Sequence, residues 1–346
     1  MRSIKFSVPL VAAIALVALV VGIVAGRTVG AVGGSSSGGG GAGGAASGKR
    51  VDVIIKASDS AFWQSMLAGA AKAGTDYGLQ VSSFGPTSET DVDQQVQLVE
   101  NSISRGVQSI VLAPNSSTAL SNVIGRARQA GIKVIIADTR VTTEANGFIG
   151  TDNTKAAEQA AVRLCDQLKQ AGKDSGDVLV EASVAGVQVI NDRQSGFAIK
   201  LAATCPKLKV VGPRYNNNDI NVATSQVNDA LTADPNLVGI FAANNASGVG
   251  AARAVKDNNA SDRIKVIAFD TDPQEAAALR DGSLGTLVVQ NPYFFGYQGV
   301  IEAGMAAVGS TPPFDLDPGA VLADRSNMDK PEIAALVTPP TAGAGK

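Results

Sequence analysis

The stretch VDVIIKASDSAFWQSMLAGA (residues 51–70) contains the pattern that the rest of the chain repeats. Four of its first five residues are apolar and β-branched, which is typical of a buried strand, and short polar residues follow. Phe62 and Trp63 come next, and Trp63 is the only tryptophan in a chain with 4% aromatic residues. An aromatic pair most often belongs to a core. Its place after a strand also suits the wall of a ligand site, and these residues alone leave both interpretations open.

Short apolar runs of the same kind alternate with longer segments of helical period. Between Asp91 and Gly106, for example, valine and isoleucine recur on one helix face. This alternation predicts parallel sheets with helices on both faces, in an α/β fold with two doubly wound sheets. The predicted strands are 51–55, 79–84, 107–113, 132–137, 177–182, 208–212, 237–243, 264–269 and 284–289.

Polar side chains follow directly after many of these strands. In open α/β sheets, ligands bind outside the carboxyl ends of the strands. Caps of the following helices explain Ser60, Ser116 and Asp272, but they do not explain lysine, arginine or glutamine at such places. The residues that we take as site candidates from this position are Lys56, Asp138, Arg140, Asn244, Asp270 and Gln290.

Composition narrows the possible functions. The chain has 346 residues, 29 Lys and Arg against 31 Asp and Glu, and no histidine. A mixed, nearly neutral surface gives no argument for nucleic acid as a partner. Without histidine, imidazole bases and the commonest metal ligand are absent. Most hydrolase mechanisms are therefore disfavoured, and we predict no enzymatic activity, no metal and no cofactor.

The first 50 residues differ from the rest. Arg2 and Lys5 precede an apolar run over 8–25, and a Gly/Ser-rich tract follows. This predicts a signal peptide or a membrane anchor over 1–32 and a linker over 33–49. No cysteine follows the apolar run, so we expect no lipoprotein. In either case, the folded part works outside the cytoplasm.

Cys165 and Cys205 are the only cysteines of the chain. In an exported protein, a lone pair favours a disulfide, which would stabilise the fold by about 4 kcal/mol in the chain-entropy model. We predict a structural disulfide between them.

The order of the motifs resembles the type I periplasmic sugar-binding proteins, especially the ribose-binding members. The resemblance spans residues 51–335. It rests on IIKASDSAFWQSMLAGA, VQLVENSISRGVQSIVLAP, GIKVIIAD, IGTDN (149–153), DRQSGF (192–197), IFAANN (240–245), VIAFDTDP (266–273) and LVVQNPYFFGYQG (287–299).

The resemblance implies two lobes that grip a ligand between them, with three crossovers near Thr151, Gln290 and Leu322 as the hinge. The first lobe would comprise 51–151 plus 291–322, the second 152–290 plus 323–335, and 336–346 would form a tail. The disulfide would lie inside the second lobe.

The family's binding residues carry over unevenly. Phe62 and Trp63 match the aromatic pair that sandwiches the sugar, and Ser60 matches a neighbouring polar contact. Asp138 matches the carboxylate that binds two hydroxyls. Lys56 stands where the ribose-binding members have a small neutral residue. Asn244, Asp270 and Gln290 match directly.

Three further positions depart from the family pattern. Arg140 lies one residue beyond the family's arginine. Asn191 stands where the ribose-binding members have arginine, and we interpret Arg193 as structural. Asn218 replaces an aromatic residue of the second lobe.

The predicted function is capture of a monosaccharide or polyol by a monomer that delivers it to the permease of an ABC importer. A sensory receptor that signals to a chemoreceptor or a sensor kinase is the alternative. A sugar acid or amino-substituted ligand stays open, because Lys56 and Arg140 are set against Asp138 and Asp270. Gly248-Val-Gly250 lacks the third glycine of the dinucleotide-binding fingerprint, so it gives little support to an enzyme that binds a dinucleotide. Lactose-repressor-type regulators use the same two-lobed fold but carry a helix-turn-helix at their start. This chain has an export segment in that place, which argues against a DNA-binding regulator.

Overall fold

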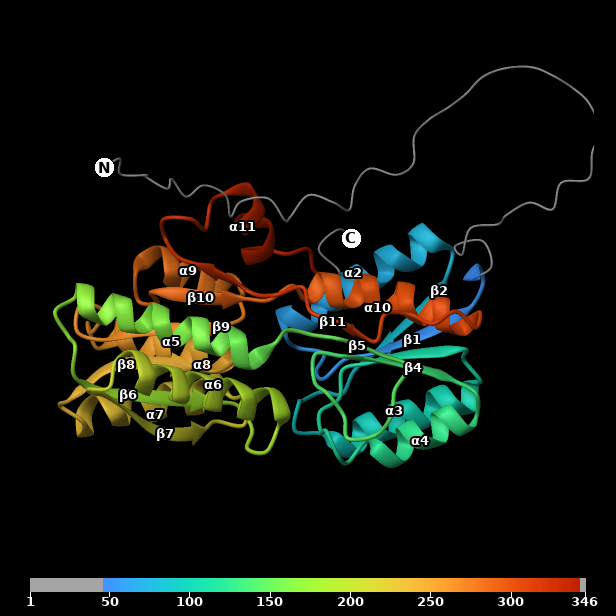
Figure 1. Cartoon of the computed structure of the whole chain (residues 1–346), viewed down its shortest axis with the longest axis horizontal. Helices are drawn as coiled ribbons and strands as arrows, with labels where there is room; N and C mark the ends of the chain where they lie inside the picture. Colours follow the sequence, from blue (N-terminus) through green and yellow to red (C-terminus); the bar gives the residue numbers. More distant parts are fainter. Residues whose placement is uncertain (1–45, 343–346) are drawn as a thin grey trace, which may run out of the picture. The chain divides into compact units, whose positions relative to one another are not determined.

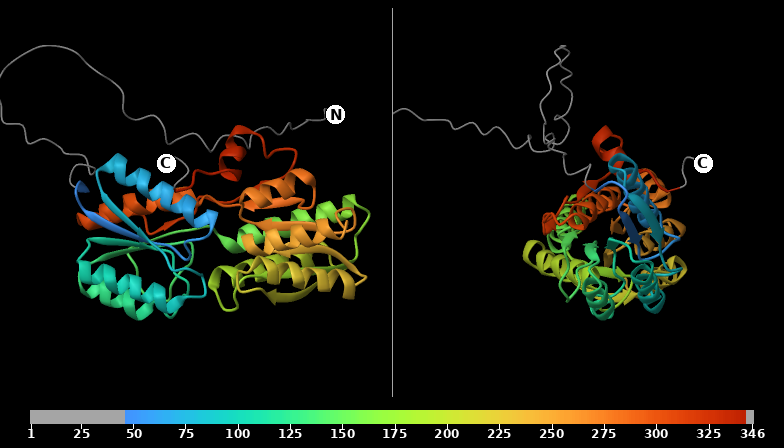
Figure 2. Two further views of the ribbon diagram at one scale, coloured as in Figure 1. Left: turned by 180° about the vertical axis from the view of Figure 1, so that it is seen from behind. Right: turned by 90° about the vertical axis from the view of Figure 1, so that its right-hand side faces the viewer.

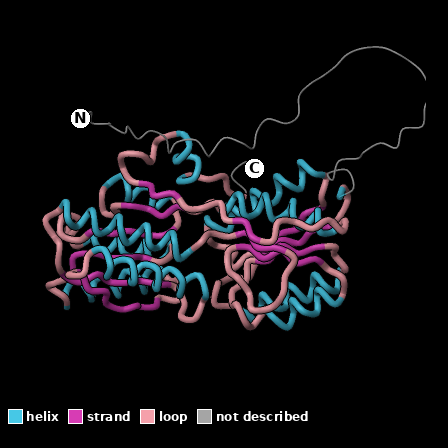
Figure 3. Tube along the Cα trace, in the orientation of Figure 1, coloured by secondary structure: helices cyan, strands magenta, loops and turns pink. Residues whose placement is uncertain are grey.

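In the computed structural model, which describes residues 46–342, each of the predicted apolar runs forms a strand. The expected fold class is confirmed: the strands form two sheets of six, and helices cover both faces of each (Figures 1 and 3). These residues belong to one compact unit. The predicted export segment (1–32), most of the linker and the last four residues of the tail lie outside the described range.

The first sheet has the strand order β11-β5-β4-β3-β1-β2, and all its neighbours are parallel. Helices α2 and α10 cover one face, and α3 and α4 cover the other (Figure 2). The elements are β1 (Arg50–Ile54), α2 (Ala61–Tyr77), β2 (Gln80–Phe84), α3 (Val92–Arg105), β3 (Ser109–Leu112), α4 (Ser121–Gln129), β4 (Lys133–Ala137), β5 (Gly147–Ile149), α10 (Pro292–Ala307) and β11 (Asp315–Leu316).

The second sheet has the order β12-β10-β9-β8-β6-β7, with only β12 antiparallel to its neighbour. Helices α5 and α6 pack on one face, and α7, α8, α9 and α11 pack on the other. The elements are α5 (Asn153–Gln170), β6 (Gly176–Ala182), α6 (Gln188–Thr204), β7 (Leu208–Tyr215), α7 (Ile220–Ala233), β8 (Leu237–Ala242), α8 (Asn245–Asp257), β9 (Lys265–Phe269), α9 (Pro273–Asp281), β10 (Thr286–Val289), β12 (Val321–Ala323) and α11 (Pro331–Val337).

The chain passes between the two sheets three times, after β5, after β10 and between β11 and β12. The expected third crossing near Leu322 needs a correction. Leu322 lies inside β12 and pairs with Val288 of the second sheet, so the crossing is at 317–320. Two-residue β11 is too short to be seen as a strand in the sequence.

Close contact between α2 and α10 fixes the start of α2. A Cβ atom on Gly69 would lie 2.0 Å from the carbonyl oxygen of Tyr293, and one on Gly296 would lie 1.8 Å from that of Met66. Only glycine allows two helix backbones to approach so closely. The close packing of α2 on α10 therefore holds Phe62 and Trp63, in the first turn of α2, in a fixed place beside β1.

The disulfide between Cys165 and Cys205 is present, with 6.2 Å between the two Cα atoms. It joins α5 to the residue that ends α6, inside the second lobe as predicted. Within residues 46–342, no helix is long and apolar enough to cross a membrane.

Candidate ligand-binding site

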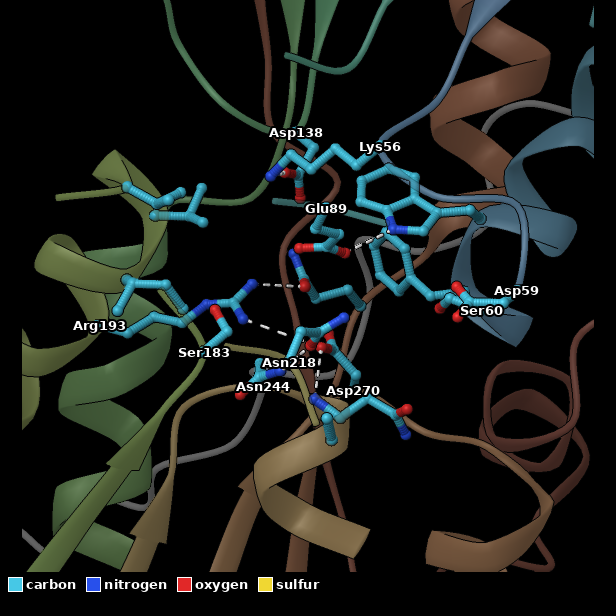
Figure 4. Close-up of a pocket in the computed structure, with 18 of the residues that line it drawn as sticks. Lys56, Asp59, Ser60, Glu89, Asp138, Ser183, Arg193, Asn218, Asn244 and Asp270 are labelled. Carbon is cyan, nitrogen blue, oxygen red and sulfur yellow. Dashed lines mark hydrogen bonds and ion pairs between the residues drawn. The ribbon is translucent and has the colours of Figure 1, made fainter. Parts of the chain in front are cut away.

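Side chains from both lobes surround a cavity of about 140 Å³ beside the carboxyl ends of the strands (Figure 4). The cavity is smaller than the 300–1,000 Å³ that is usual for drug-sized ligands. Nine of the predicted site residues line it: Lys56, Ser60, Phe62, Trp63, Asp138, Asn218, Asn244, Asp270 and Gln290.

Lys56 forms a buried ion pair on the first-lobe side. Its Nζ lies 2.6 Å from Oδ2 of Asp138 and donates a second hydrogen bond of 2.6 Å to Oγ1 of Thr139. Thr139 in turn donates to Asp138 over 2.7 Å. Burial favours a higher pKa for Asp138, but the charges of Lys56 and Arg193 hold the pKa below its usual value. Asp138 is therefore an ionised acceptor at neutral pH.

The aromatic pair belongs both to the core and to the cavity wall. The Phe62 and Trp63 rings meet edge to face with 4.7 Å between centroids, and both pack in the core of the first lobe. Trp63 is only 3% exposed, yet it lines the cavity, and Nζ of Lys56 lies 5.4 Å from its ring centroid. The two interpretations of the pair are thus compatible.

Arg193, on α6, is the main hydrogen-bond donor on the second-lobe side. Its Nε donates to Oδ1 of Asn153 (2.8 Å), its Nη1 to the Ala243 carbonyl (2.7 Å) and its Nη2 to Oε1 of Gln290 (2.7 Å). The guanidinium lies 4.0 Å from the centroid of the Phe269 ring. The interpretation of Arg193 as purely structural is therefore incomplete, because this side chain also lines the cavity.

Gln290 links the site to the crossovers. Its Nε2 donates to Oγ1 of Thr151 over 2.8 Å, while its Oε1 accepts from Arg193. Thr151 and Gln290 belong to two different crossover segments. One hydrogen-bond chain thus connects the cavity wall to the segments that join the lobes.

Asp270 offers a free acceptor. Oδ2 accepts from the backbone N–H of Asn245 (3.2 Å) and lies 3.9 Å from Nη1 of Arg193, whereas buried Oδ1 has no partner among the described residues. Burial raises the pKa of Asp270 to about 6, against the opposing charge of Arg193. Beside it, Nδ2 of Asn244 donates to Oδ1 of Asn218 over 2.7 Å. The second-lobe wall therefore retains hydrogen-bonding capacity for a ligand.

Two predicted residues do not reach the cavity. Arg140 forms two hydrogen bonds of 2.8 Å with Asp315 and packs 3.8 Å from the centroid of the Phe148 ring, on the outside of the first lobe. Asn191 is exposed on α6. Because successive helix residues are about 100° apart, Asn191 and Arg193 face nearly opposite directions. Arg193 points inward, and this corrects both assignments.

The prediction missed several residues that line the cavity. Glu89 lies in the loop after β2, a strand-end position of the kind that marked the other candidates, so this signal was available. Ser183 follows β6 in the same way. Nothing in the sequence singled out the aliphatic side chains of the second-lobe wall, which are Val187, Val189, Ile190 and Ile220.

Comparison with known proteins gives consistent matches. A family model described as "Periplasmic binding protein domain" matches residues 51–310. The D-allose-binding periplasmic protein of Escherichia coli (strain K12) is 26% identical over 281 residues, covering 79% of this chain and 89% of that protein.

Two solved structures are similar over almost their whole length. A carbohydrate transporter solute binding protein from Agrobacterium Radiobacter, in complex with D-arabinose, is 34% identical with a TM-score of 0.82, covering 84% of this chain and 99% of that one. An ABC transporter solute binding protein from Agrobacterium vitis, with bound D-fucose, is 32% identical with a TM-score of 0.79, covering 83% and 99%.

Proposed function

Because this chain belongs to the periplasmic binding protein family, we propose that it is an extracytoplasmic solute-binding protein that captures a monosaccharide or polyol between its lobes and delivers it to an ABC importer. The observation that carries this proposal is the small cavity lined by both lobes, with an aromatic pair on one side and hydrogen-bonding side chains around it.

The lining suits the chemistry of a sugar. Hydroxyl groups both donate and accept, which matches Asp138, Asn244 and Asp270, while the C–H face of a ring suits the flat surfaces of Phe62 and Trp63. A buried hydroxyl left unpaired would cost about 1–3 kcal/mol, so such a site discriminates between epimers. We assign the predicted ligand contacts to the nine cavity residues and exclude Arg140 and Asn191.

The lobes would work as a clamp. A ligand that contacts both lobes favours the closed arrangement, which the permease would recognise. In this proposal the first lobe comprises residues 51–151 plus 291–317, and the second comprises 152–290 plus 320–335. Residues 1–32 would direct export, as a cleaved signal peptide or a retained anchor, with 33–49 as the linker.

A thermal-shift screen of the full chain tests the function. The probes are D-arabinose, D-fucose, D-allose, D-ribose, D-tagatose and ribitol, with D-galacturonate, D-glucosamine and the amino acids as competing classes. A ligand at 100 times its Kd stabilises the folded state by about 2.7 kcal/mol. We expect a shift with at least one neutral sugar or polyol. Shifts with amino acids alone would contradict the proposal.

A further inference from the structure

The side chains around the cavity include more acidic groups than basic ones. Two cations, Lys56 and Arg193, face four carboxylates, Asp59, Glu89, Asp138 and Asp270. Lys56 pairs with Asp138 at 2.6 Å, and Arg193 lies 3.9 Å from Asp270. Asp59 is exposed at the rim. Glu89 is therefore the interior carboxylate that forms no ion pair with any described residue.

Trp63 holds Glu89 in place. The indole Nε1–H donates to Oε1 of Glu89 over 2.8 Å. Figure 4 shows the Glu89 carboxylate in the middle of the cavity, below Lys56 and Asp138 and to the right of Arg193. Its second oxygen, Oε2, accepts no hydrogen bond within residues 46–342. An oriented acceptor with a free oxygen thus faces the space that a ligand would fill.

An ionised carboxylate accepts hydrogen bonds but donates none, so the ligand group that meets Glu89 has to be a donor. A sugar hydroxyl meets this need, whereas a second carboxylate would bring two like charges together in a partly buried site. The positive charges that could offset a ligand carboxylate already have acidic neighbours. The excess of carboxylates in the cavity therefore disfavours binding of anionic ligands.

Resting on the proposed function, we infer that Glu89 is a specificity-determining residue. Its Oε2 accepts a hydrogen bond from a ligand hydroxyl, and in its ionised form its charge excludes sugar acids. Trp63 acts as its positioning residue through the indole N–H, in addition to presenting its ring to the sugar. The ligand class is thus narrowed to neutral sugars and polyols.

Isothermal titration calorimetry of the wild type and of Glu89→Gln tests this inference. D-arabinose, D-fucose and D-allose serve as neutral probes and D-galacturonate as the acid, since D-galacturonate and D-fucose differ only in the group at C6. Because burial raises the pKa of Glu89, the titrations are made at pH 8. The matched control is Glu332→Gln, which changes an exposed carboxylate on α11.

We expect Glu89→Gln to weaken binding of the neutral sugar about 10- to 100-fold, because a charge-assisted hydrogen bond contributes about 1.5–3 kcal/mol. Its affinity for D-galacturonate relative to the neutral sugar should rise, and Glu332→Gln should behave as wild type. Equal neutral-sugar affinity in Glu89→Gln and wild type would overturn the inference while leaving the proposed function intact. Wild type that binds none of the neutral sugars and polyols of the thermal-shift screen would contradict the proposed function itself, as would a preference for the acid.

Trp63→Phe separates positioning from folding. It keeps an aromatic ring and removes the N–H donor, so it should weaken binding in the wild-type background and have less effect when Glu89→Ala, which removes the acceptor, is already present. Equal effects in both backgrounds would show that Trp63 acts without Glu89. Melting temperatures of the ligand-free variants verify that each one is folded.

Discussion

The two walls of the cavity differ in how far they satisfy their own polar groups. On the first-lobe wall, Lys56, Asp138 and Thr139 bond to one another, the aromatic pair packs into the core behind them, and Glu89 keeps one oxygen, Oε2, open toward the cavity. On the second-lobe wall, Arg193 donates three hydrogen bonds to protein partners, but Oδ1 of Asp270 is buried without a partner among residues 46–342.

This difference suggests separate tasks for the two lobes. The paired groups of the first lobe form a rigid network, which can present the aromatic surface and the Oε2 atom of Glu89 without reorganisation. A wall with a buried free acceptor gains stability only when a ligand donor arrives. The first lobe would thus supply the platform for the sugar, and the second lobe would respond to its presence.

We expect the largest effect from Arg193→Ala, on the second-lobe wall. The substitution removes the hydrogen-bond donor of Asn153 and Gln290 and the positive charge 3.9 Å from Asp270, so the free energy of unfolding should fall by about 3–5 kcal/mol. Urea denaturation of the ligand-free protein measures the change. Arg193→Lys keeps the charge but not the planar donor group, and it should recover only part of the loss. A loss below about 1 kcal/mol would mean that the second-lobe wall does not depend on Arg193.

Asp270 on the second-lobe wall and Asp138 on the first-lobe wall should change the free energy of unfolding with pH in opposite directions. The folded-state pKa of Asp270 is raised from 3.8 to about 6, so its contribution is most favourable below pH 4 and is lost as the pH rises from about 4 to 6. Asp270→Asn removes this dependence. Its free energy of unfolding, relative to wild type, should therefore increase by about 3 kcal/mol between pH 4 and pH 7.

Asp138→Asn is the matched control on the other wall. The pKa of Asp138 is lowered, so its contribution is present above pH 4 and is lost as the pH falls further. The relative stability of Asp138→Asn should therefore decrease as the pH rises through that acidic range, opposite in sign to Asp270→Asn. Chemical denaturation at several pH values measures both. The same sign for both variants would contradict the assigned electrostatics of the walls.

Much of the first-lobe wall could be predicted from the sequence, because its residues follow strand ends within short segments. Lys56, Phe62 and Trp63 lie within ten residues of β1, and Asp138 follows β4 directly. Position along the chain then determines position in space. Most of the fold was predictable for the same reason, since most buried strands are apolar runs with a helical segment after them. The three-residue strand β5, which follows β4 without a helix between them, was not predicted.

The second-lobe wall was harder to predict, because α6 contributes from inside a helix. There the direction of a side chain depends on its position around the helix. An error of two residues in the assignment selects the outward-facing Asn191 in place of the inward-facing Arg193. The aliphatic lining depends on loop and helix packing that leaves no local pattern. Glu89 differs from these residues, because the strand-end rule applies to the loop after β2 as well.

Arg140→Ala tests whether Arg193, and not Arg140, is the arginine of the binding site, and we expect it to change stability and affinity least. The Arg140 side chain is 51% exposed, and its partner Asp315 is 54% exposed, so solvent and salt screen the pair. Arg140→Ala should lower the free energy of unfolding by at most about 1 kcal/mol and leave the sugar affinity at its wild-type value. Denaturation at low and high salt, together with calorimetry on the sugar found in the screen, measures both. A loss of affinity comparable to that of Glu89→Gln would return Arg140 to the binding site, and the arginine would then have to reach the cavity by a rearrangement of the segment after β4.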